Sequence, residues 1–334
     1  MRIIVPMAGM GKRMRPHTLT VPKPLIPVAG KPIVQWLVED ITKVCSEKVE
    51  EIAFVIGDFG EAVEKELVAI AERLGAKGTI HYQDEPLGTA HAILCARSAL
   101  HGKVIVAFAD TLFRADFKID DKQDGVIWVN KIEDPRMFGV VKVNGDGIIT
   151  DFVEKPQHFV SDLAIIGIYY FKDGDYLRKE MQYLIDNNIK EKGEFQLTNA
   201  LENMKSKGTR FVPGKVEEWL DCGNKDATVY TNKRVLELNR NTGLIAADVK
   251  KDNAIIIEPC FIGEKVELKN CIVGPHVSLG AGCRVESSVI TNSIVQTNAK
   301  IKNSVIDNSM IGHYAEYSNA PEQLSLSDYS THQS

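Results

Sequence analysis

MRIIVPMAGMGKRMRPHTLTVPKPLIPVAGKP, residues 1–32, is the stretch from which the fold of this chain can be read. Its apolar run Ile3-Ile4-Val5 is β-branched and stops at a turn that contains glycine, which predicts a buried strand followed by a tight loop. Glycines in such a loop let successive backbone N–H groups turn towards an anion. The stretch therefore predicts a polyphosphate site formed by Ala8, Gly9, Gly11, Lys12, Arg13, Arg15 and Lys23.

Two familiar phosphate loops do not fit this stretch. The Walker pattern needs glycine five places before Gly11-Lys12 and Ser or Thr after it, but the chain has Pro6 and Arg13 there. The dinucleotide fingerprint needs Gly or Ala at position 14, which is Met14, and an acidic residue about twenty positions further on is also missing. The anion site therefore belongs to another class.

A third pattern does fit. The segment G-x-G-x-R, residues 9–13, followed by P-K-P-x-x-P-V, residues 22–28, resembles the signature of the sugar-nucleotide pyrophosphorylases. These nucleotidyltransferases join a nucleoside triphosphate (NTP) to a sugar 1-phosphate, and the resemblance implies the same reaction and a Mg²⁺ cofactor here. Met10 and Lys12 depart from the commoner residues of the signature. The alternative interpretation is a glycine turn that carries solvated basic residues.

Composition narrows the classes of protein that this chain can belong to. With 334 residues it is long enough for two domains, and its 44% hydrophobic and 25% charged content is ordinary for a globular protein. A net charge of −5 argues against a nucleic-acid partner, and no apolar run approaches the ~20 residues that span a bilayer. The first strand starts at residue 2 or 3, and the six cysteines form no CxxC pair. We therefore expect no signal peptide, reduced thiols and a cytoplasmic location.

The order of periodic segments predicts the first fold. Strands at 3–5, 52–57, 80–83 and 104–109 alternate with helices that begin at residues 33, about 63 and 88 or 89, the last one extending through Ala99. This rhythm is typical of an α/β protein with a Rossmann-like, mixed but mainly parallel sheet and helices on both faces. A strand-rich part follows, with a hairpin turn at residues 144–147, two helices at about 176–187 and 194–204, and a last helix at 226–238.

Beyond residue 240 the pattern changes to short Ile/Val/Leu-Gly steps separated by small and polar residues. Such repeats fit hexapeptide rungs and resemble left-handed parallel β-helix domains; an irregular β-sandwich is the alternative. We therefore expect a nucleotidyltransferase catalytic domain at 1–240, a left-handed β-helix at 241–312 and a polar tail at 313–334. Because a few rungs bury little apolar area alone, we also expect a homo-oligomer that uses this domain.

Two aspartates follow bulky apolar segments and are candidates for a metal site. Asp110 follows the apolar run 104–109, and Asp221 lies in Trp219-Leu220-Asp221-Cys222-Gly223. A hard cation such as Mg²⁺ prefers carboxylate and phosphate oxygens. The alternative is a purely structural role, in which the Asp110 side chain caps the next turn. The family resemblance implies that the two carboxylates together hold the metal.

The resemblance also implies roles for residues near the base and the sugar. Gln83, Gly88 and Thr89 match the base-recognition segment, where an amide can read the N3–H and O4 edge of uracil or thymine. On the sugar side, the matching residues are Gly139, Glu154, Lys155, Gly167 and Thr198. Taken alone, Gln83 is as well explained as a surface polar residue, and Glu154-Lys155-Pro156 as a charged strand end.

The resemblance implies a Mg²⁺-dependent enzyme that makes an NDP-sugar from an NTP, with dTTP or UTP favoured, and a sugar 1-phosphate, with glucose 1-phosphate favoured. Arg13 and Lys23 would hold the β- and γ-phosphates, and Lys155 would orient the attacking phosphate. Two alternatives stay open: a non-catalytic nucleotide-sugar sensor, and a bifunctional enzyme whose β-helix transfers an acetyl group. His276 and His313 are the only histidines available in the repeats for the second alternative.

Overall fold

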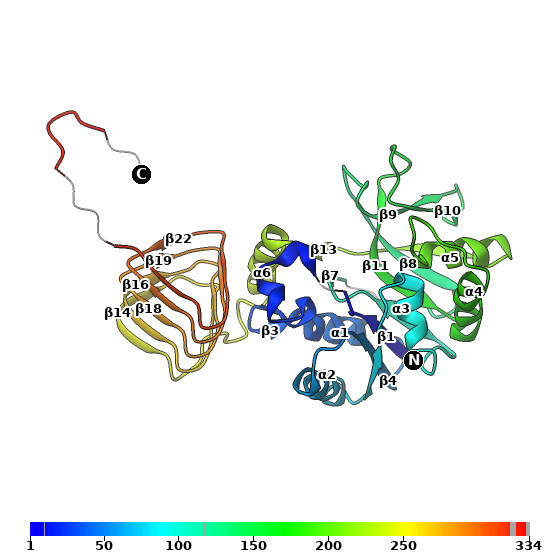
Figure 1. The fold of residues 1–334 in the computed structure, drawn as a ribbon, viewed down its shortest axis with the longest axis horizontal. Coiled ribbons are helices and arrows are strands. Elements are labelled where there is room, and N and C mark those ends of the chain that lie inside the picture. The colour runs from blue at the N-terminus through cyan, green and yellow to red at the C-terminus, as the bar shows by residue number, and fades with distance from the viewer. Residues whose placement is uncertain (10, 116–117, 321–324, 332–334) are drawn as a thin grey trace. The chain divides into compact units, whose positions relative to one another are not determined.

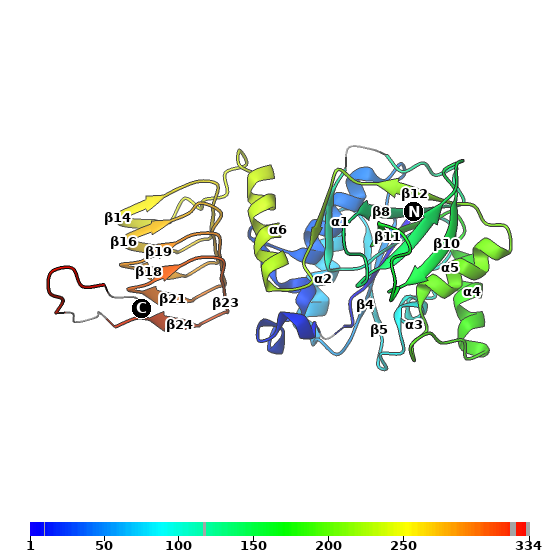
Figure 2. The ribbon, with the colours of Figure 1, turned by 90° about the horizontal axis from the view of Figure 1, so that it is seen from above.

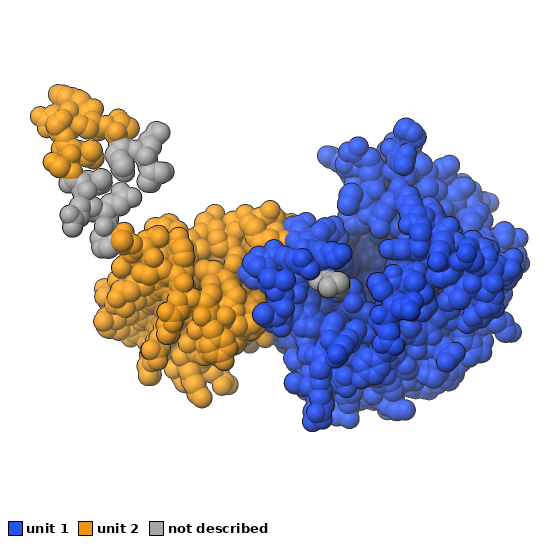
Figure 3. Space-filling view, viewed as in Figure 1, with its two compact units in different colours: residues 1–26, 31–224 blue, residues 27–30, 225–334 orange. Residues whose placement is uncertain are grey.

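A computed structural model describes residues 1–9, 11–115, 118–320 and 325–331. The chain divides into two compact units, which Figure 3 shows in blue and orange. Unit 1 consists of residues 1–26 and 31–224, and unit 2 of residues 27–30 and 225–334. Met10, in the middle of the predicted phosphate loop, lies outside the described residues.

Unit 1 is built on a nine-stranded mixed sheet, seen with its helices in Figures 1 and 2. Its path runs β10-β9-β11-β6-β1-β4-β5, with β8 beside β11 and β12 beside β8. β1 pairs in parallel with β4 and β6, whereas β11 runs antiparallel to β6, β8 and β9. The strands are β1 (Arg2–Pro6), β4 (Glu51–Ile56), β5 (Lys77–Tyr82), β6 (Val104–Ala107), β8 (Gly125–Lys131), β9 (Gly139–Val143), β10 (Ile149–Glu154), β11 (Leu163–Phe171) and β12 (Phe211–Lys215).

The helices of unit 1 form where apolar residues recur at helical spacing. In α1, Ile33, Leu37 and Ile41 are buried, as an amphipathic helix on a sheet requires. The five helices are α1 (Ile33–Val44), α2 (Glu61–Arg73), α3 (Thr89–Cys95), α4 (Gly174–Asp186) and α5 (Leu197–Ser206). These elements confirm the predicted mixed α/β fold, and the turn at 144–147 joins the antiparallel strands β9 and β10 as expected.

Two local predictions were wrong. Helix α3 ends at Cys95 rather than Ala99, because residues 96–99 form turns. Strand β6 ends at Ala107, so Asp110 does not end that strand; it lies in the turn before the short strand β7 (Thr111–Arg114). β7 pairs antiparallel with β13 (Glu218–Asp221), and this pairing brings Asp221 beside the turn that contains Asp110.

Unit 2 is a parallel β-helix, visible in Figure 2 as stacked rungs that carry β14, β16, β18, β21 and β24 in order. Each strand pairs in parallel with a segment 16 or 17 residues further along: Lys250 with Glu267, Arg284 with Lys300, Lys300 with Glu316. This regular offset excludes the β-sandwich alternative, because sandwich strands pair antiparallel. The strands are β14 (Lys250–Ile256), β15 (Phe261–Ile262), β16 (Glu267–Val273), β17 (Ser278–Leu279), β18 (Arg284–Glu286), β19 (Val289–Ile290), β20 (Ile294–Val295), β21 (Lys300–Lys302), β22 (Val305–Ile306), β23 (Met310–Ile311) and β24 (Glu316–Ser318).

The boundaries of unit 2 differ from the sequence-based domains at both ends. Helix α6 (Lys225–Leu238) belongs to unit 2, and its residue Asn232 accepts a hydrogen bond from the hydroxyl of Ser278 at 2.7 Å. His276 Nε2 lies 2.6 Å from Glu237 Oε1 of the same helix. At the other end, β24 continues the β-helix past residue 312. Two further short strands are β2 (Pro27–Val28) and β3 (Lys31–Pro32).

The cysteine side chains are mostly buried. All six cysteines are free, and burial raises the pKa of the Cys45, Cys260 and Cys283 thiols to about 11. Such thiols are protonated and unreactive at neutral pH. Within the described part of the chain, no helix combines the length and the apolar character that crossing a membrane requires.

Candidate active site

The predicted phosphate loop and Asp110 meet at one edge of the sheet. β1 and β6 are parallel neighbours, so the segments that follow them emerge at the same side. In open sheets this carboxyl edge is where ligands bind. A cavity of about 440 Å³ opens there in unit 1, lined by the glycine loop, by Asp110 and by the segment around Gln83.

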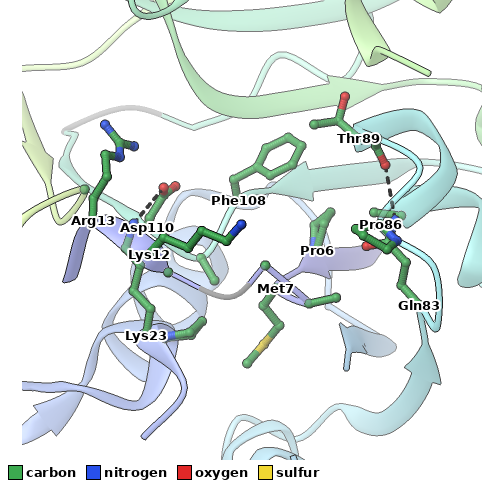
Figure 4. A pocket seen from close by; sticks show the side chains of 18 of the residues that line it. Pro6, Met7, Lys12, Arg13, Lys23, Gln83, Pro86, Thr89, Phe108 and Asp110 are labelled. Carbon is green, nitrogen blue, oxygen red and sulfur yellow. Dashed lines mark hydrogen bonds and ion pairs between the residues drawn. The ribbon is translucent and has the colours of Figure 1, made fainter. Parts of the chain in front are cut away.

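The cavity has two chemically different ends, as Figure 4 shows. Arg13, Lys23 and Asp110 lie towards one end, and Gln83, Pro86 and Thr89 lie towards the other. The ring of Phe108 and the backbone of the loop lie between them. A long ligand with charge at one end and a polar planar group at the other matches this order.

Gly11 shapes the loop at the charged end. Its φ of +57° is a left-handed conformation that favours glycine, and an added Cβ would lie 2.9 Å from the Cβ of Lys23. The Gly11 carbonyl also accepts a hydrogen bond from the hydroxyl of Thr18 at 2.9 Å. The loop is therefore folded back on the P-K-P segment, and this contact brings Lys23 beside the glycines.

Lys23 is buried, with 8% of its surface exposed, and its ammonium pairs with a carboxylate. Lys23 Nζ lies 2.9 Å from Asp110 Oδ2, whose side chain is much more open. Burying a charged lysine is costly unless a partner compensates it, so the Asp110 carboxylate holds Lys23 in place. From the sequence, we expected Lys23 to bind the phosphates and Asp110 to bind the metal. The ion pair between them was not predicted.

Asp221 lies beside Asp110. The backbone N–H of Cys222 donates to the Asp110 carbonyl at 2.9 Å, and Asp221 pairs with Thr111 in the β7–β13 ribbon. Burial, and then the neighbouring negative charge of Asp110, raise the pKa of the Asp221 carboxyl above its usual range. A carboxylate whose negative charge is disfavoured by burial and by a neighbouring carboxylate makes its surroundings favourable for a cation.

The two carboxylates supply only some of the oxygen ligands that Mg²⁺ needs. Across the described residues, no cluster of three or more His, Cys, Asp or Glu side chains could hold a metal ion. Mg²⁺ in phosphate-transfer sites is commonly bound by one or two carboxylates together with phosphate oxygens and waters. Asp110 and Asp221 meet that requirement, and substrate phosphates at the charged end would supply the remaining oxygens.

At the other end, His91 fixes the amide of Gln83. Gln83 Nε2 lies 3.3 Å from the Gly88 carbonyl oxygen and 3.1 Å from His91 Nδ1. The carbonyl only accepts hydrogen bonds, so the amide nitrogen must face it, and both amide hydrogens then have acceptors. Among the described residues Oε1 has no partner, so Gln83 presents an acceptor alone. This differs from the prediction that the Gln83 amide offers the base both a donor and an acceptor.

Gly88 is required for the docking of its own loop. Its φ is +120°, and an added Cβ would lie 2.5 Å from the Phe195 carbonyl oxygen and 2.6 Å from the Phe195 nitrogen. Thr89 continues this contact: its hydroxyl donates to Gln196 Oε1 at 3.1 Å and accepts from the Leu197 N–H at 2.8 Å. The base-side segment is thus fastened to the start of α5.

The proposed sugar-side residues form a second cluster next to the cavity. Glu154 pairs with Gly139 across β10 and β9, and the Thr198 hydroxyl lies 3.4 Å from Glu154 Oε2. Lys155 Nζ lies 3.5 Å from Glu154 Oε1. Gly167 accepts a hydrogen bond from the N–H of Phe108, which lines the cavity, at 2.9 Å.

Comparison with known proteins identifies the family. A family model described as nucleotidyl transferase matches residues 3–237. The chain belongs to the nucleotidyl transferase family. A glucose-1-phosphate thymidylyltransferase from Streptomyces griseus is 29% identical over 99% of this chain and 98% of that protein. The catalytic subunit beta of mannose-1-phosphate guanylyltransferase from Danio rerio is 38% identical over 51% of this chain and 49% of that protein.

The fold has solved counterparts. A crystal structure of UDP-glucose pyrophosphorylase in complex with UDP-glucose has a TM-score of 0.57 and 23% identity, and the match covers 71% of this chain and 98% of that one. At 23% identity this similarity shows a shared fold and nothing more. The chain is therefore a nucleotidyl transferase whose fold is that of nucleotide-sugar enzymes.

Sequence reasoning missed several side chains of this nucleotidyl transferase site. His91 and Gln196 orient the base-side residues, and Phe108 lines the middle of the cavity. Lys192 Nζ donates to the Lys155 carbonyl at 2.9 Å, which adds a cation beside the sugar-side cluster. None of these residues lies in the motif of residues 9–28, and only the fold brings them to the site.

Proposed function

We propose that this nucleotidyl transferase joins an NTP to a sugar 1-phosphate and releases pyrophosphate, with dTTP or UTP and glucose 1-phosphate as the favoured pair. The observation that carries the proposal is the order of groups along one cavity: cations and the Asp110 carboxylate at one end, an amide acceptor at the other. That order matches the phosphates and the base of an NTP. The name of the Streptomyces griseus relative supports the choice of substrates.

The reaction needs charge neutralisation and alignment more than acid–base chemistry. A phosphate oxygen of the sugar 1-phosphate attacks the α-phosphorus of the NTP, and the bond from that phosphorus to the oxygen bridging to the β-phosphate breaks. Pyrophosphate leaves with that oxygen and its electron pair. Arg13 and Lys23 would hold the β- and γ-phosphates, and backbone N–H groups of Gly9 and Gly11 would face them.

We propose Mg²⁺ as the cofactor, held by Asp110 and Asp221. The chemistry supplied by the bound ion is neutralisation of the charge that gathers on the phosphate oxygens. Lys23 already neutralises part of the Asp110 charge, and it can turn its ammonium to a phosphate when a cation takes its place at the carboxylate. Asp110 would thus pair with the lysine in one state and hold the metal together with Asp221 in the other.

Gln83 would select the base by hydrogen-bond polarity. An acceptor alone pairs with a ring nitrogen that carries hydrogen, as N3 does in uracil and thymine. Cytosine and adenine present a lone pair at the corresponding position, so the two acceptors would repel. Guanine also carries a ring N–H, so polarity separates UTP, dTTP and GTP from CTP and ATP, and the size of the base must do the rest.

On the sugar side, Glu154 would accept hydrogen bonds from sugar hydroxyls, and Lys155 would attract the attacking phosphate. The Thr198 hydroxyl supports one oxygen of Glu154 and Lys155 lies near the other, so the carboxylate is held at two points. Charged contacts of this kind orient a nucleophile at little further entropy cost.

The two alternative functions receive less support. A non-catalytic sensor is expected to lack cations or carboxylates of the site, and the cavity keeps Arg13, Lys23 and Asp110. For acetyl transfer a histidine of the β-helix must be available. The ring of His276 is tied to Glu237 and Asn292, and His313 Nδ1 lies 2.6 Å from the Thr297 hydroxyl.

The decisive experiment is a pyrophosphate-release screen of ATP, CTP, GTP, UTP and dTTP against glucose, galactose, mannose and N-acetylglucosamine 1-phosphates. We expect the highest rate with dTTP or UTP and glucose 1-phosphate, and loss of the signal with EDTA. Release with no pair would overturn the reaction class. A best rate with GTP would keep the class and overturn the proposed base.

A further inference from the structure

One carboxylate of the catalytic cavity has no role in the reaction proposed above. Glu194 lines this cavity. It lies beside the base-side segment, because a Cβ added to Gly88 would come within 3.0 Å of the Glu194 Cβ, and the Gly88 carbonyl is a group that holds the Gln83 amide. A carboxylate repels the phosphates of a nucleotide. Glu194 must therefore face another part of the ligand.

The backbone of Glu194 is fixed by a tight turn. Glu191 and Glu194 exchange two backbone hydrogen bonds, of 2.9 and 3.1 Å, and the two residues between them have φ values of +52° and +86°. Two positive φ values match the preferred two-residue hairpin turn. The next residue, Phe195, donates its N–H to the Leu87 carbonyl at 2.8 Å. The backbone that carries Glu194 is therefore fastened to the base-side segment.

Gln196 aims the carboxylate of Glu194. The Gln196 side chain is buried, with 6% of the residue exposed, and its Nε2 donates to Glu194 Oε2 at 3.0 Å. Its Oε1 accepts from the Thr89 hydroxyl at 3.1 Å, so both ends of the amide are fixed. Across the described residues, Glu194 forms no ion pair and no further side-chain hydrogen bond. Its second oxygen, Oε1, is left for a ligand.

Few groups of an NTP can donate a hydrogen bond to this oxygen. The phosphates have no hydrogen to give, and the N3–H of uracil or thymine is the partner that Gln83 Oε1 requires. The ribose hydroxyls remain. The ribose is bonded directly to the base, so a group beside the base-side segment is within its reach. An acidic side chain also binds the ribose 2′-hydroxyl in dinucleotide-binding folds.

We propose that Glu194 accepts a hydrogen bond from the ribose 2′-hydroxyl and thereby selects ribonucleotides, with Gln196 as its positioning residue. This inference rests on the proposed function, since it takes an NTP as the occupant of the cavity. It adds a choice that the acceptor on Gln83 cannot make, because uracil and thymine present the same N3–H. The Glu194 carboxylate favours UTP over dTTP.

The comparison that isolates the hydroxyl is UTP against dUTP, which share the base and the phosphates. A site built to bind a hydroxyl disfavours the analogue that lacks it, since the acceptor is then left unpaired. We expect kcat/KM of the unaltered chain for UTP to exceed that for dUTP by about ten- to a hundredfold. Pyrophosphate release at saturating glucose 1-phosphate and Mg²⁺ gives both values.

The first test removes the carboxylate. Glu194→Ala should lower kcat/KM for UTP about ten- to a hundredfold and leave that for dUTP within about twofold. The KM for glucose 1-phosphate should not change, and the melting temperature should change little because Glu194 is exposed. Glu85→Ala removes an exposed carboxylate of the same base-side segment that does not line the cavity. It is the matched control and should keep the ratio of UTP to dUTP.

The second test concerns Gln196. Gln196→Met should lower the ratio of UTP to dUTP about threefold, since Glu194 stays in the chain but loses the bond that aims it. In the double variant Glu194→Ala with Gln196→Met, the ratio should equal that of Glu194→Ala, because Gln196 acts through Glu194. A merely structural role of Gln196 would instead lower the efficiencies with UTP and dUTP alike.

A third nucleotide identifies the hydroxyl. 3′-deoxy-UTP keeps the 2′-hydroxyl, so Glu194→Ala should lower its kcat/KM by the same factor as for UTP. An unchanged value would show that the 3′-hydroxyl is the bound group and would overturn the assignment to the 2′-hydroxyl. Equal use of UTP and dUTP by the unaltered chain, or a ratio that Glu194→Ala leaves unchanged, would overturn the proposal as a whole.

This inference and the proposed function can fail separately. If the unaltered chain uses dUTP as well as UTP, the proposed reaction stands and the role of Glu194 falls. If no NTP yields pyrophosphate, the reaction falls, and calorimetric Kd values for UTP and dUTP then test Glu194 by binding alone. A Kd for UTP that is at least about tenfold lower, and loses this advantage in Glu194→Ala, would support the contact. Equal Kd values would overturn it.

Discussion

Lys23 Nζ and Asp110 Oδ2 lie 2.9 Å apart, so the signature lysine and a candidate metal ligand form an ion pair. The pair joins residues 87 positions apart in the chain. The carboxylate compensates the cost of burying a lysine that is only 8% exposed at the edge of the sheet. The pair also means that a substitution at either residue changes the electrostatic environment of the other.

The carboxylates are the first target for mutation. Asp110→Asn or Asp221→Asn should lower kcat by a few orders of magnitude, since several kcal/mol of charge stabilisation in the transition state depends on them. Pyrophosphate release at saturating Mg²⁺ measures the effect, and circular dichroism checks the fold. Asp146→Asn, in the exposed hairpin turn, is the control. Near-normal turnover of either site variant would refute the metal assignment.

Substitutions at the NTP end and at the sugar side of the site should change different kinetic constants. Arg13→Ala should raise the KM for the NTP and lower kcat, with a smaller change in the KM for the sugar 1-phosphate. Lys155→Ala should mainly raise the KM for the sugar 1-phosphate, because its ammonium lies by Glu154 outside the cavity lining. Steady-state kinetics with each substrate varied provide the measurement. Equal effects of both variants on both substrates would show that the roles are assigned wrongly.

His91 should act on base selection through Gln83. His91→Phe removes the acceptor of one amide hydrogen, so only the Gly88 carbonyl still holds the amide nitrogen away from the base and the orientation of Gln83 becomes less fixed. We expect the ratio of kcat/KM for UTP over CTP to fall about tenfold, as one unpaired polar group costs about 1–3 kcal/mol. The KM for the sugar 1-phosphate should not change. His91→Asn keeps an acceptor and should recover part of the selectivity.

His81 offers a matched control for that experiment. It lies on β5 two residues before Gln83, and its Nε2 contacts the Thr79 hydroxyl at 3.2 Å instead of the amide. His81→Phe should leave the ratio for UTP over CTP unchanged. If it lowers the ratio as much as His91→Phe, the loss reflects general disturbance of β5.

The contact of α6 with the β-helix should depend on pH. The hydrogen bond from His276 lowers the pKa of the Glu237 carboxyl below its usual 4.5. A lowered pKa in the folded state adds stability above about pH 4.5, which is lost as the pH falls through the lowered value. Thermal melts should therefore show Glu237→Gln less stable than the parent at pH 7, and this difference should shrink below pH 4. A constant difference across this range would exclude Glu237 titration as its source.

The features that could be predicted from the sequence are those formed by residues close together in the chain. The strand, the glycine loop and the P-K-P segment of residues 1–32 could be predicted from the sequence. Each of them depends on the conformational preferences of residues that are close together in the chain. The β-helix was likewise predictable, since each rung repeats the same short pattern. The family of the chain and its mixed α/β fold therefore followed from the sequence.

Other features depended on contacts between distant segments. Helix α3 ends earlier than its apolar pattern predicts, since tertiary context can override local helix propensity. Helix α6 belongs to unit 2 because its side chains contact the β-helix, as Asn232 does with Ser278. The pairing of Lys23 with Asp110 and the hold of His91 on Gln83 arise from side chains that only the fold brings within reach. Sequence patterns identify which residues can do chemistry; the tertiary structure decides which partners hold them, because hydrogen bonds and ion pairs act over a few ångströms of space and not along the chain.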